Sequence, residues 1–313
     1  MDLRDTYLPH SDSANERVID SVLASDTFDG EFAICDSVRY KDDVPQAVMD
    51  IIAPMRAERF DEKYPLVVFV QGSGWTTPHR LYAFGRLLNL SARGYVVATI
   101  SHRDSLQGEN PFPAYLEDVK SAIRFLKLHA SRYHIDSKRV GIWGTSSGAN
   151  AALLVAMTAG DKRYDDGTNS GINDAVDYVV SCFAPSDIYG ILSGEERNPS
   201  PDIVGCEKPI VGMSQTQSWD NTDEIIRQRA WDMSPVRIVS HQKKYPPLLL
   251  LHGDADEIVN IDETLKLYHL LRDTGSDVRC IKVRGGEHEG NFWSSAVDNV
   301  IYDFIDDHAD KQL

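Results

Sequence analysis

The sequence is poor in cysteine and in positive charge, and it has no long apolar run. Its four cysteines, Cys35, Cys182, Cys206 and Cys280, are far apart and form no CxxC pair, which argues against zinc-finger spacing and a disulfide framework. A formal net charge of -16 without a basic stripe argues against a nucleic-acid partner. No apolar run approaches the length of a membrane span, and the N-terminus lacks the pattern of a signal peptide. We therefore expect a cytoplasmic protein with reduced thiols that binds neither nucleic acid nor a membrane.

What is present is a series of short apolar runs that alternate with amphipathic segments. A length of 313 residues and a hydrophobic content of 42% allow a sizeable core. Runs typical of strands buried on both faces are PLVVFVQ, GYVVATI, RVGIWG, DYVVSCF and PPLLLLHG, and DVRCIKV follows near the end of the chain. Between them, residues 114–130, 261–272 and 292–305 have apolar positions at helical spacing. This alternation predicts an α/β fold with a mostly parallel, doubly wound sheet and helices on both faces.

Three segments lie outside this alternation. Residues 1–30 are polar and acidic, and we interpret them as an N-terminal extension with a short helix near residues 17–23. FAICDSVRY and QAVMDIIAP, on either side of KDDVP, predict an antiparallel hairpin. Residues 187–246 contain prolines, glycines and two tryptophans, and such a long connection predicts a small cap. Without internal repeats or a flexible linker, residues 1–313 are expected to form a single domain with this cap inserted.

The segment VGIWGTSSGAN, residues 140–150, stops an apolar run at a glycine and then places three hydroxyl residues in a row. A strand before it and a helix after it give the strand–turn–helix context of a nucleophile elbow, G-x-S-x-G, centred on Ser146. Thr145 and Ser147 are off-centre, so their side chains are expected to point away from the exposed tip. The alternative interpretation is a serine-rich helix start in an ordinary α/β protein.

A serine hydroxyl is a poor nucleophile unless a base removes its proton, and in this arrangement the acid and then the base follow on later loops. LLLLHGDADEIV ends a buried strand and supplies Asp254 and Asp256. IKVRGGEHEGNFW places His288 between the last strand and the last helix. His252, at a strand end, is interpreted as structural, and His102 in ISHRD is placed to line a pocket rather than to act as the base.

The turn in VVFVQGSGW follows the first strong core strand, where backbone donors for a developing oxyanion are expected. Gly72, Ser73 and Gly74 permit close backbone approach, and Trp75 would supply a flat apolar wall. The amide of Ser147, at the helix start, is expected to face the substrate carbonyl. Alone, the GSG sequence would predict only a tight turn.

QGSGW, GTSSG, HGDADEIV and GGEH together resemble the α/β-hydrolase superfamily, specifically small esterases related to hormone-sensitive lipase. Within these, the sequence is most similar to the bifunctional feruloyl and acetyl-xylan esterases, and FPAYLEDVKSAIRFLK and ISHRD add to the resemblance, which covers about residues 32–305. The resemblance implies an α/β-hydrolase fold and ester hydrolysis without a cofactor. It matches Ser146 to the nucleophile, His288 to the base and Asp256 to the acid. Asp254 falls on a variable position of the pattern HG-x-x-D-x-x-V and is the alternative acid.

The oxyanion motif departs from the family pattern at two positions. The resemblance matches Gly72, Ser73 and Ser147 to the donor positions. The family commonly begins this motif with His, where this chain has Gln71, and Ser73 replaces a middle glycine. Because the donors are backbone groups, neither change should abolish the hole, but the changes leave open which N–H groups point inward.

Other classes of protein share parts of this pattern. A prolyl-oligopeptidase-like peptidase shares HGDAD and the serine elbow but usually carries a propeller, and this chain has no such repeats. A serine amidase, such as a kynurenine-formamidase-like enzyme, stays open as the alternative function. A catalytically dead binding protein would tend to lack one of the three side chains. Asp254, Asp256 and His288 are potential ligands of a divalent ion, but without HExxH or a second cluster we expect no metal.

The substrate is the least determined part of the prediction. Candidate contacts are Gly74, Trp75, Trp219 and His102, with Tyr82 and Phe292 as further aromatic candidates. For each aromatic residue the alternative is packing in the core or on the surface. The short predicted cap favours short acyl or hydroxycinnamoyl (feruloyl or chlorogenate) esters over long-chain triglycerides. We therefore expect a serine carboxylesterase with a small-molecule ester as its substrate; whether the chain forms a homo-oligomer stays open.

Overall fold

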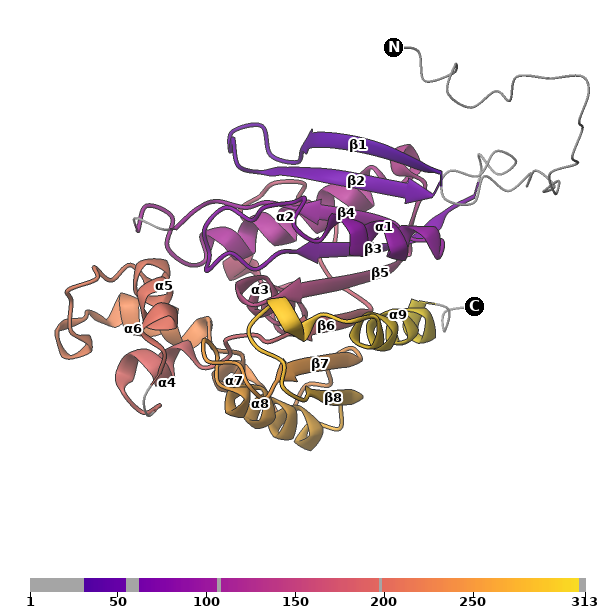
Figure 1. Ribbon diagram of the computed structural model, residues 1–313. Coiled ribbons are helices and arrows are strands. Elements are labelled where there is room, and N and C mark those ends of the chain that lie inside the picture. Colours follow the sequence, from indigo (N-terminus) through magenta and orange to yellow (C-terminus); the bar gives the residue numbers. More distant parts are fainter. Residues whose placement is uncertain (1–30, 55–61, 106–107, 197–198, 310–313) are drawn as a thin grey trace, which may run out of the picture.

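A computed structural model describes residues 31–54, 62–105, 108–196 and 199–309. These residues form an eight-stranded sheet with the order β1-β2-β4-β3-β5-β6-β7-β8 (Figure 1). The strands are β1 (Phe32–Arg39), β2 (Val48–Pro54), β3 (Tyr64–Val70), β4 (Val96–Ile100), β5 (Ile135–Thr145), β6 (Tyr178–Cys182), β7 (Leu248–Gly253) and β8 (Val278–Val283). The helices are α1 (Phe84–Ala92), α2 (Ala114–Leu128), α3 (Ser147–Met157), α4 (Ile188–Ser193), α5 (Pro201–Val211), α6 (Glu224–Asp232), α7 (Pro235–Ile238), α8 (Ile261–Asp273) and α9 (Ser295–Ala309).

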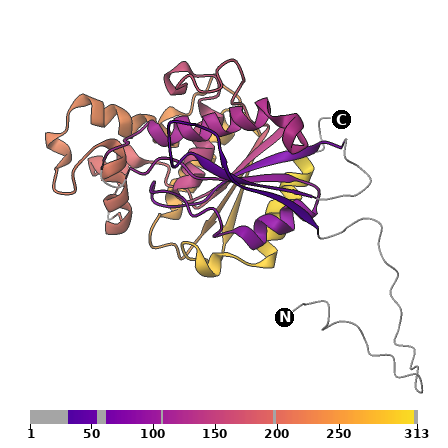
Figure 2. The same cartoon turned by 90° about the horizontal axis from the view of Figure 1, so that it is seen from above.

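The sheet is parallel except at its N-terminal edge. β1 pairs antiparallel with β2, and β2 with β4, whereas the pairs from β4–β3 through β7–β8 are parallel. Helices α1 and α9 pack on one face, and α2, α3 and α8 on the other (Figure 2). Strands β3, β4, β6 and β7 are buried along their whole length because both faces are covered, which explains their continuous apolar sequences. The predicted α/β-hydrolase architecture with its antiparallel hairpin is confirmed.

The predicted helices are present with small shifts of their ends. Residues 114–130 and 261–272 correspond to α2 and α8. The last helix begins later than predicted, at Ser295, because Gly290–Phe292 forms a short 3-10 turn and Trp293 is extended. Two predictions, the extension at residues 1–30 and its short helix, lie outside the described residues.

Residues 187–246, the predicted cap, contain α4 to α7 and connect β6 to β7. Helices α4, α5 and α6 lie beyond the carboxyl ends of the strands (Figure 1). The amide of Phe112 donates to the carbonyl of Ile210 at 2.7 Å, which joins α5 to the segment before α2. The two ends of this region are also joined, because the buried carboxylate of Asp187, just before α4, binds Arg237, on α7, at 2.8 Å. The single-domain boundaries and a role of this region as a cap stay predictions.

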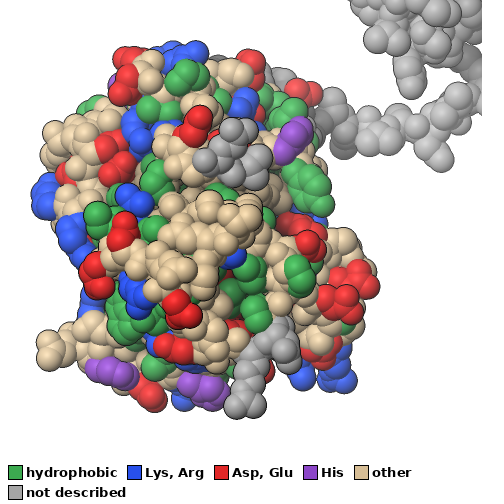
Figure 3. Space-filling view, turned by 90° about the vertical axis from the view of Figure 1, so that its left-hand side faces the viewer, with side chains coloured by type: hydrophobic (Ala, Val, Ile, Leu, Met, Phe, Trp, Pro, Cys, Tyr) green, Lys and Arg blue, Asp and Glu red, His purple; other side chains and the backbone are tan. Residues whose placement is uncertain are grey.

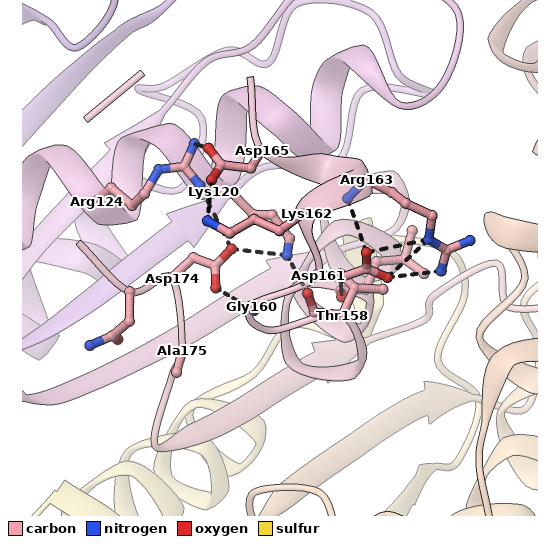
Figure 4. Close-up of polar contacts among 12 residues, drawn as sticks. Lys120, Arg124, Thr158, Gly160, Asp161, Lys162, Arg163, Asp165, Asp174 and Ala175 are labelled. Carbon is pink, nitrogen blue, oxygen red and sulfur yellow. Dashed lines mark hydrogen bonds and ion pairs between the residues drawn. The ribbon is translucent and has the colours of Figure 1, made fainter. Parts of the chain in front are cut away.

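Buried cations on α2 hold the connection between α3 and β6 (Figure 4). The fully buried ammonium of Lys120 donates to the carbonyl of Thr158 at 2.5 Å and to Asp174 at 3.0 Å. One turn later, the buried guanidinium of Arg124 lies 3.5 Å from a carboxylate oxygen of Asp165. Since an unpaired buried charge is costly, these contacts fix the connection against α2. The helix that follows Ser146 is thereby held at its far end.

No helix in the described ranges has the length and hydropathy to cross a bilayer. The four cysteines all have free thiols. The cytoplasmic location stays a prediction.

Glu263 links the start of α8 to the end of β6. Its side chain is buried, and its Oε2 accepts hydrogen bonds from the amides of Ser186 (2.6 Å) and Asp187 (2.8 Å). Burial raises the pKa of Glu263 to about 7, although these two hydrogen bonds act in the opposite direction. The folded protein therefore binds a proton at Glu263 that the unfolded chain releases near pH 4.5.

We expect Glu263→Gln to remove a pH-dependent loss of stability. A raised acid pKa favours folding below the unfolded pKa, and this contribution is lost as pH rises from 4.5 through about 7. The free energy of unfolding of the wild type should fall relative to that of the variant by up to about 3 kcal/mol over this window, at about 1.4 kcal/mol per pKa unit. Urea unfolding at half-unit pH steps measures the difference, with the exposed neighbour Asp262→Asn as control. Parallel curves for wild type and Glu263→Gln would contradict the assignment.

Candidate active site

The turn between β5 and α3 holds Ser146 in a strained backbone conformation, with φ 50° and ψ −124°. The two glycines around it are required by contact distance. A Cβ on Gly144 would lie 2.1 Å from the carbonyl oxygen of Gly148, and a Cβ on Gly148 would lie 2.1 Å from that of Val70. The amide of Ser146 donates to the carbonyl of Cys182 at 2.9 Å, which ties the turn to β6. The sequence G-x-S-x-G is therefore dictated by close packing of β3, β5 and α3.

The structure brings the three predicted catalytic side chains into one hydrogen-bonded chain. Ser146 Oγ lies 3.0 Å from Nε2 of His288, and Nδ1 of His288 lies 2.8 Å from Oδ2 of Asp256. They follow β5, β8 and β7, respectively, at the carboxyl ends of the strands. In such an arrangement the imidazole can accept the serine proton while the carboxylate holds the ring in the required tautomer.

The surroundings of Asp256 keep it ionised. Its carboxylate is fully buried, and burial by itself raises the pKa. Hydrogen bonds from His252 and His288, the charge of His288 and the amide of Val259 outweigh burial and hold the pKa of Asp256 well below its usual range. Its Oδ1 accepts from the amides of Ile258 and Val259, each at 2.9 Å. The negative charge opposite the imidazole is thus present throughout the neutral and mildly acidic range.

His252 is a buried neighbour of Asp256, the candidate acid. Its ring is fully buried, with Nδ1 2.7 Å from the hydroxyl of Thr264 and Nε2 2.9 Å from the carbonyl of Val259. Nε2 also lies 3.2 Å from Oδ2 of Asp256. The sequence suggested a structural histidine here, but not this contact with the acid.

Asp254, the alternative acid, has different partners. Its Oδ1 accepts the amide of Gly285 at 2.6 Å, and its Oδ2 lies 3.7 Å from the ammonium of Lys282. Asp254 thus belongs to the surface of the loop after β7.

The oxyanion turn differs in detail from the prediction. The amide of Gly72 donates to the hydroxyl of Thr145 at 2.8 Å, and the amide of Ser73 donates to the hydroxyl of Ser147 at 2.9 Å. The amides of these two predicted donors are therefore already hydrogen-bonded inside the protein, to the two hydroxyl groups that flank Ser146. The amides of Gly74 and Ser147 donate to no acceptor in the described ranges.

The predicted substrate contacts are placed unequally. Trp75 is fully buried and packs edge-on against Tyr115, with ring centroids 6.4 Å apart. Trp75 therefore does not form the expected flat apolar wall at the surface of the site, because its side chain is buried in the core. His102 is also buried, and burial lowers its pKa. Trp219 is half-buried and packs against Tyr189 at 5.2 Å, so its contact with substrate stays a prediction.

Of the further aromatic candidates, Tyr82 is exposed, whereas Phe292 is fully buried and packs against Phe183 at 4.8 Å. Phe183 directly follows β6 with a positive φ of 43°. Its ring also meets the imidazole of His288 edge-on, with centroids 4.8 Å apart. Sequence reasoning missed Phe183, and its only signal was its place at the end of a buried strand.

Figure 3 shows the side of the molecule that lies at the carboxyl ends of the parallel strands, and acidic, basic and hydrophobic side chains are interspersed there. In the described part of the chain, no three His, Cys, Asp or Glu side chains are grouped so that they could hold a metal ion.

Ser146 occupies a strained turn between a strand of a largely parallel sheet and the helix that follows. A serine on such a turn in such a sheet defines the α/β-hydrolase class of proteins. Residues 49–271 match the BD-FAE family. The chain therefore belongs to the BD-FAE family.

Known relatives are consistent with this family. Esterase LipC of Mycobacterium tuberculosis is 26% identical over 80% of this chain and 58% of its own length. A truncated carbohydrate esterase from gut microbiota is 25% identical, with a TM-score of 0.75 over 90% of this chain and 98% of that one. A bifunctional GH43-CE protein of Bacteroides eggerthii is 27% identical, with a TM-score of 0.72 over 88% of this chain and 38% of that one. The chain spans about half the length of the curated relatives it matches.

We expect Asp256→Asn to lower kcat for p-nitrophenyl acetate by about 10⁴-fold, because an amide at this position favours the wrong imidazole tautomer. Asp254→Asn should lower it less than tenfold, since this residue binds only the surface loop. Circular dichroism of both variants checks that they fold alike. The reverse ranking would make Asp254 the acid.

Proposed function

We propose that this protein is a serine carboxylesterase that hydrolyses short-chain acyl or hydroxycinnamoyl esters through an acyl-enzyme intermediate. The observation that carries the proposal is the hydrogen-bonded chain from Ser146 through His288 to Asp256, with contacts of 3.0 and 2.8 Å. Membership of the BD-FAE family and the esterase names of its relatives support the same reaction class.

In acylation, Ser146 Oγ attacks the ester carbonyl carbon while Nε2 of His288 takes the hydroxyl proton. Asp256 stabilises the resulting imidazolium through Nδ1. The carbonyl oxygen becomes an oxyanion that needs preorganised N–H donors. The amides of Gly72 and Ser73 already donate to hydroxyl groups of the protein. We therefore assign the donors to the amides of Gly74 and Ser147.

The tetrahedral intermediate then collapses, and the bond from carbon to the leaving oxygen breaks. The alcohol departs with the proton that His288 held. In deacylation, water attacks the acyl carbon and gives a proton to His288, and that proton returns to Ser146 Oγ as the carboxylic acid leaves. The cycle uses no cofactor.

The packing of α5 against the oxyanion turn supports the proposal that the acyl group of the substrate is small. The thiol of Cys206, on α5, lies so close to the oxyanion turn that a Cβ on Gly74 would come within 2.8 Å of its sulfur. This packing leaves little space beside the assigned donor Gly74. The name of one structural relative, a carbohydrate esterase, favours an ester on a carbohydrate or a similar small alcohol.

A panel of p-nitrophenyl esters tests the substrate class. We expect acetyl and butyryl esters to give kcat/KM at least about tenfold above that of the palmitoyl ester, and methyl ferulate or chlorogenate to be hydrolysed. The matched p-nitroanilides should react far more slowly, because an amine is a poorer leaving group. Preference for the long chain would contradict the short-acyl assignment, and preference for the anilides would support an amidase.

We expect Ser146→Ala to lower kcat by about 10⁵-fold or more while the protein remains folded. A serine-directed organophosphonate should label the wild type once per chain, and fragmentation of the labelled peptide should place the added mass on Ser146 itself. Activity should be insensitive to EDTA. Retained turnover in the variant, or a label on Ser147, would identify a different nucleophile.

A further inference from the structure

Glu289 directly follows the candidate base His288 and is held in an unusual conformation. Its φ is 65° and its ψ is −153°, a region that is costly for any residue other than glycine. Strain of this kind, of order 1–3 kcal/mol, persists only where surrounding contacts determine it. Glu289 is therefore held by its contacts, and its side chain shows which ones.

Both carboxylate oxygens of Glu289 are hydrogen-bonded. Oε1 accepts from the side-chain amide of Gln71 at 3.1 Å, and Oε2 accepts from the indole N–H of Trp293 at 2.6 Å. Gln71 is separated from Glu289 by 218 positions in the sequence. The carboxylate thus bridges two distant parts of the site. We call Gln71, Glu289 and Trp293 the carboxylate clamp.

Gln71 connects the clamp to the oxyanion turn. It lies between the end of β3 and Gly72, and its side chain is buried. This is the position where related esterases commonly have His and where the sequence departs from the pattern. The amide N–H of glutamine does not titrate, so Gln71 can donate to Glu289 at every pH at which the protein is folded. The departure therefore has a partner in this chain, on the loop of the base.

Trp293 connects the clamp to the strand of the nucleophile. Its ring packs against Trp143 on β5, with centroids 6.3 Å apart, and against Phe183 at 6.0 Å. The guanidinium of Arg86 lies 3.8 Å from the centroid of the same indole, and it binds Asp298 at 2.6 Å. The indole N–H therefore offers Glu289 a fixed donor.

We propose that Glu289 is a positioning residue for His288. By binding Gln71 and Trp293 together, Glu289 fixes the base loop relative to both the oxyanion turn and the strand that carries the nucleophile. The clamp thereby sets the distance of 3.0 Å between His288 Nε2 and Ser146 Oγ. The proposal rests on the proposed esterase function and goes beyond the three catalytic side chains.

Kinetics per active site separate positioning from a general effect on folding. Organophosphonate titration counts the competent sites, and kcat is then expressed per titrated site. We expect Glu289→Ala to lower this kcat by 10-fold to about 100-fold with KM changed less than threefold, because misplacement of a catalytic group by about 1 Å can cost that much. Glu289→Gln should recover at least half of the loss in the logarithm of kcat per site. Its amide can accept from Trp293 and donate to Oε1 of Gln71, which has no partner among the described residues.

A double-mutant cycle tests the link between the two loops. Gln71→Ala should lower kcat per site. Combining it with Glu289→Ala should cost little more than Glu289→Ala alone, because Glu289→Ala already removes the contact that Gln71→Ala removes. Glu287→Ala is the matched control, since this exposed glutamate lies on the same loop immediately before His288. It should leave kcat per site within twofold of the wild type.

Three outcomes would overturn the clamp: a kcat per site within threefold of the wild type in Glu289→Ala, full multiplication of the two single losses, or an equal loss in Glu287→Ala. If Glu289→Ala does not fold, Gln71→Ala carries the test, and a kcat per site equal to that of the wild type in this variant would overturn it. A wild type that neither hydrolyses esters nor reacts with the phosphonate would refute the proposed function instead. The two failures are therefore distinguishable.

Discussion

The contact between Gly148 and the end of β3 is the constraint on which the site depends. Only a residue without a side chain lets the start of α3 approach the carbonyl of Val70, since a Cβ there would lie 2.1 Å from its oxygen. This approach brings the elbow beside the turn that follows β3, so that Ser73 can donate to the hydroxyl of Ser147. The proposed nucleophile, the proposed oxyanion turn and the helix start are consequently one packed unit, and loops bring the proposed base and acid to it.

The loops are held by polar contacts that are themselves buried. His252 and two backbone amides hold Asp256, and the low pKa of that carboxyl is a consequence of these donors overcoming burial. The ring of Phe183 meets the imidazole of His288 edge-on. Preorganisation of this kind means that little of the binding energy of a substrate is needed to arrange the catalytic groups.

Much of this was predictable, for identifiable reasons. Strands buried on both faces leave continuous apolar sequences, so β3 to β7 are visible in the sequence. The order of Ser146, Asp256 and His288 follows the order of strands, which makes the grouping of these three side chains predictable from three short motifs. The partners of the turn amides were harder to predict, because the amides of Gly72 and Ser73 donate to hydroxyls more than seventy positions away. The pairing of a glutamine with a glutamate 218 positions later leaves no local pattern at all.

Residues with a positive φ lie both beside the proposed site and far from it, and only the remote ones can be replaced to gain stability without affecting the site. Ser146, Phe183 and Glu289 all have them, and each uses its side chain in or beside the hydrogen-bonded chain. His134 has the same backbone feature, with φ 56°, but it precedes β5 at the end of the strand remote from Ser146. A glycine or asparagine there would relieve conformational strain without altering the reaction centre. Engineering for thermal robustness should therefore begin at the amino ends of the strands, where a more relaxed backbone carries no catalytic penalty.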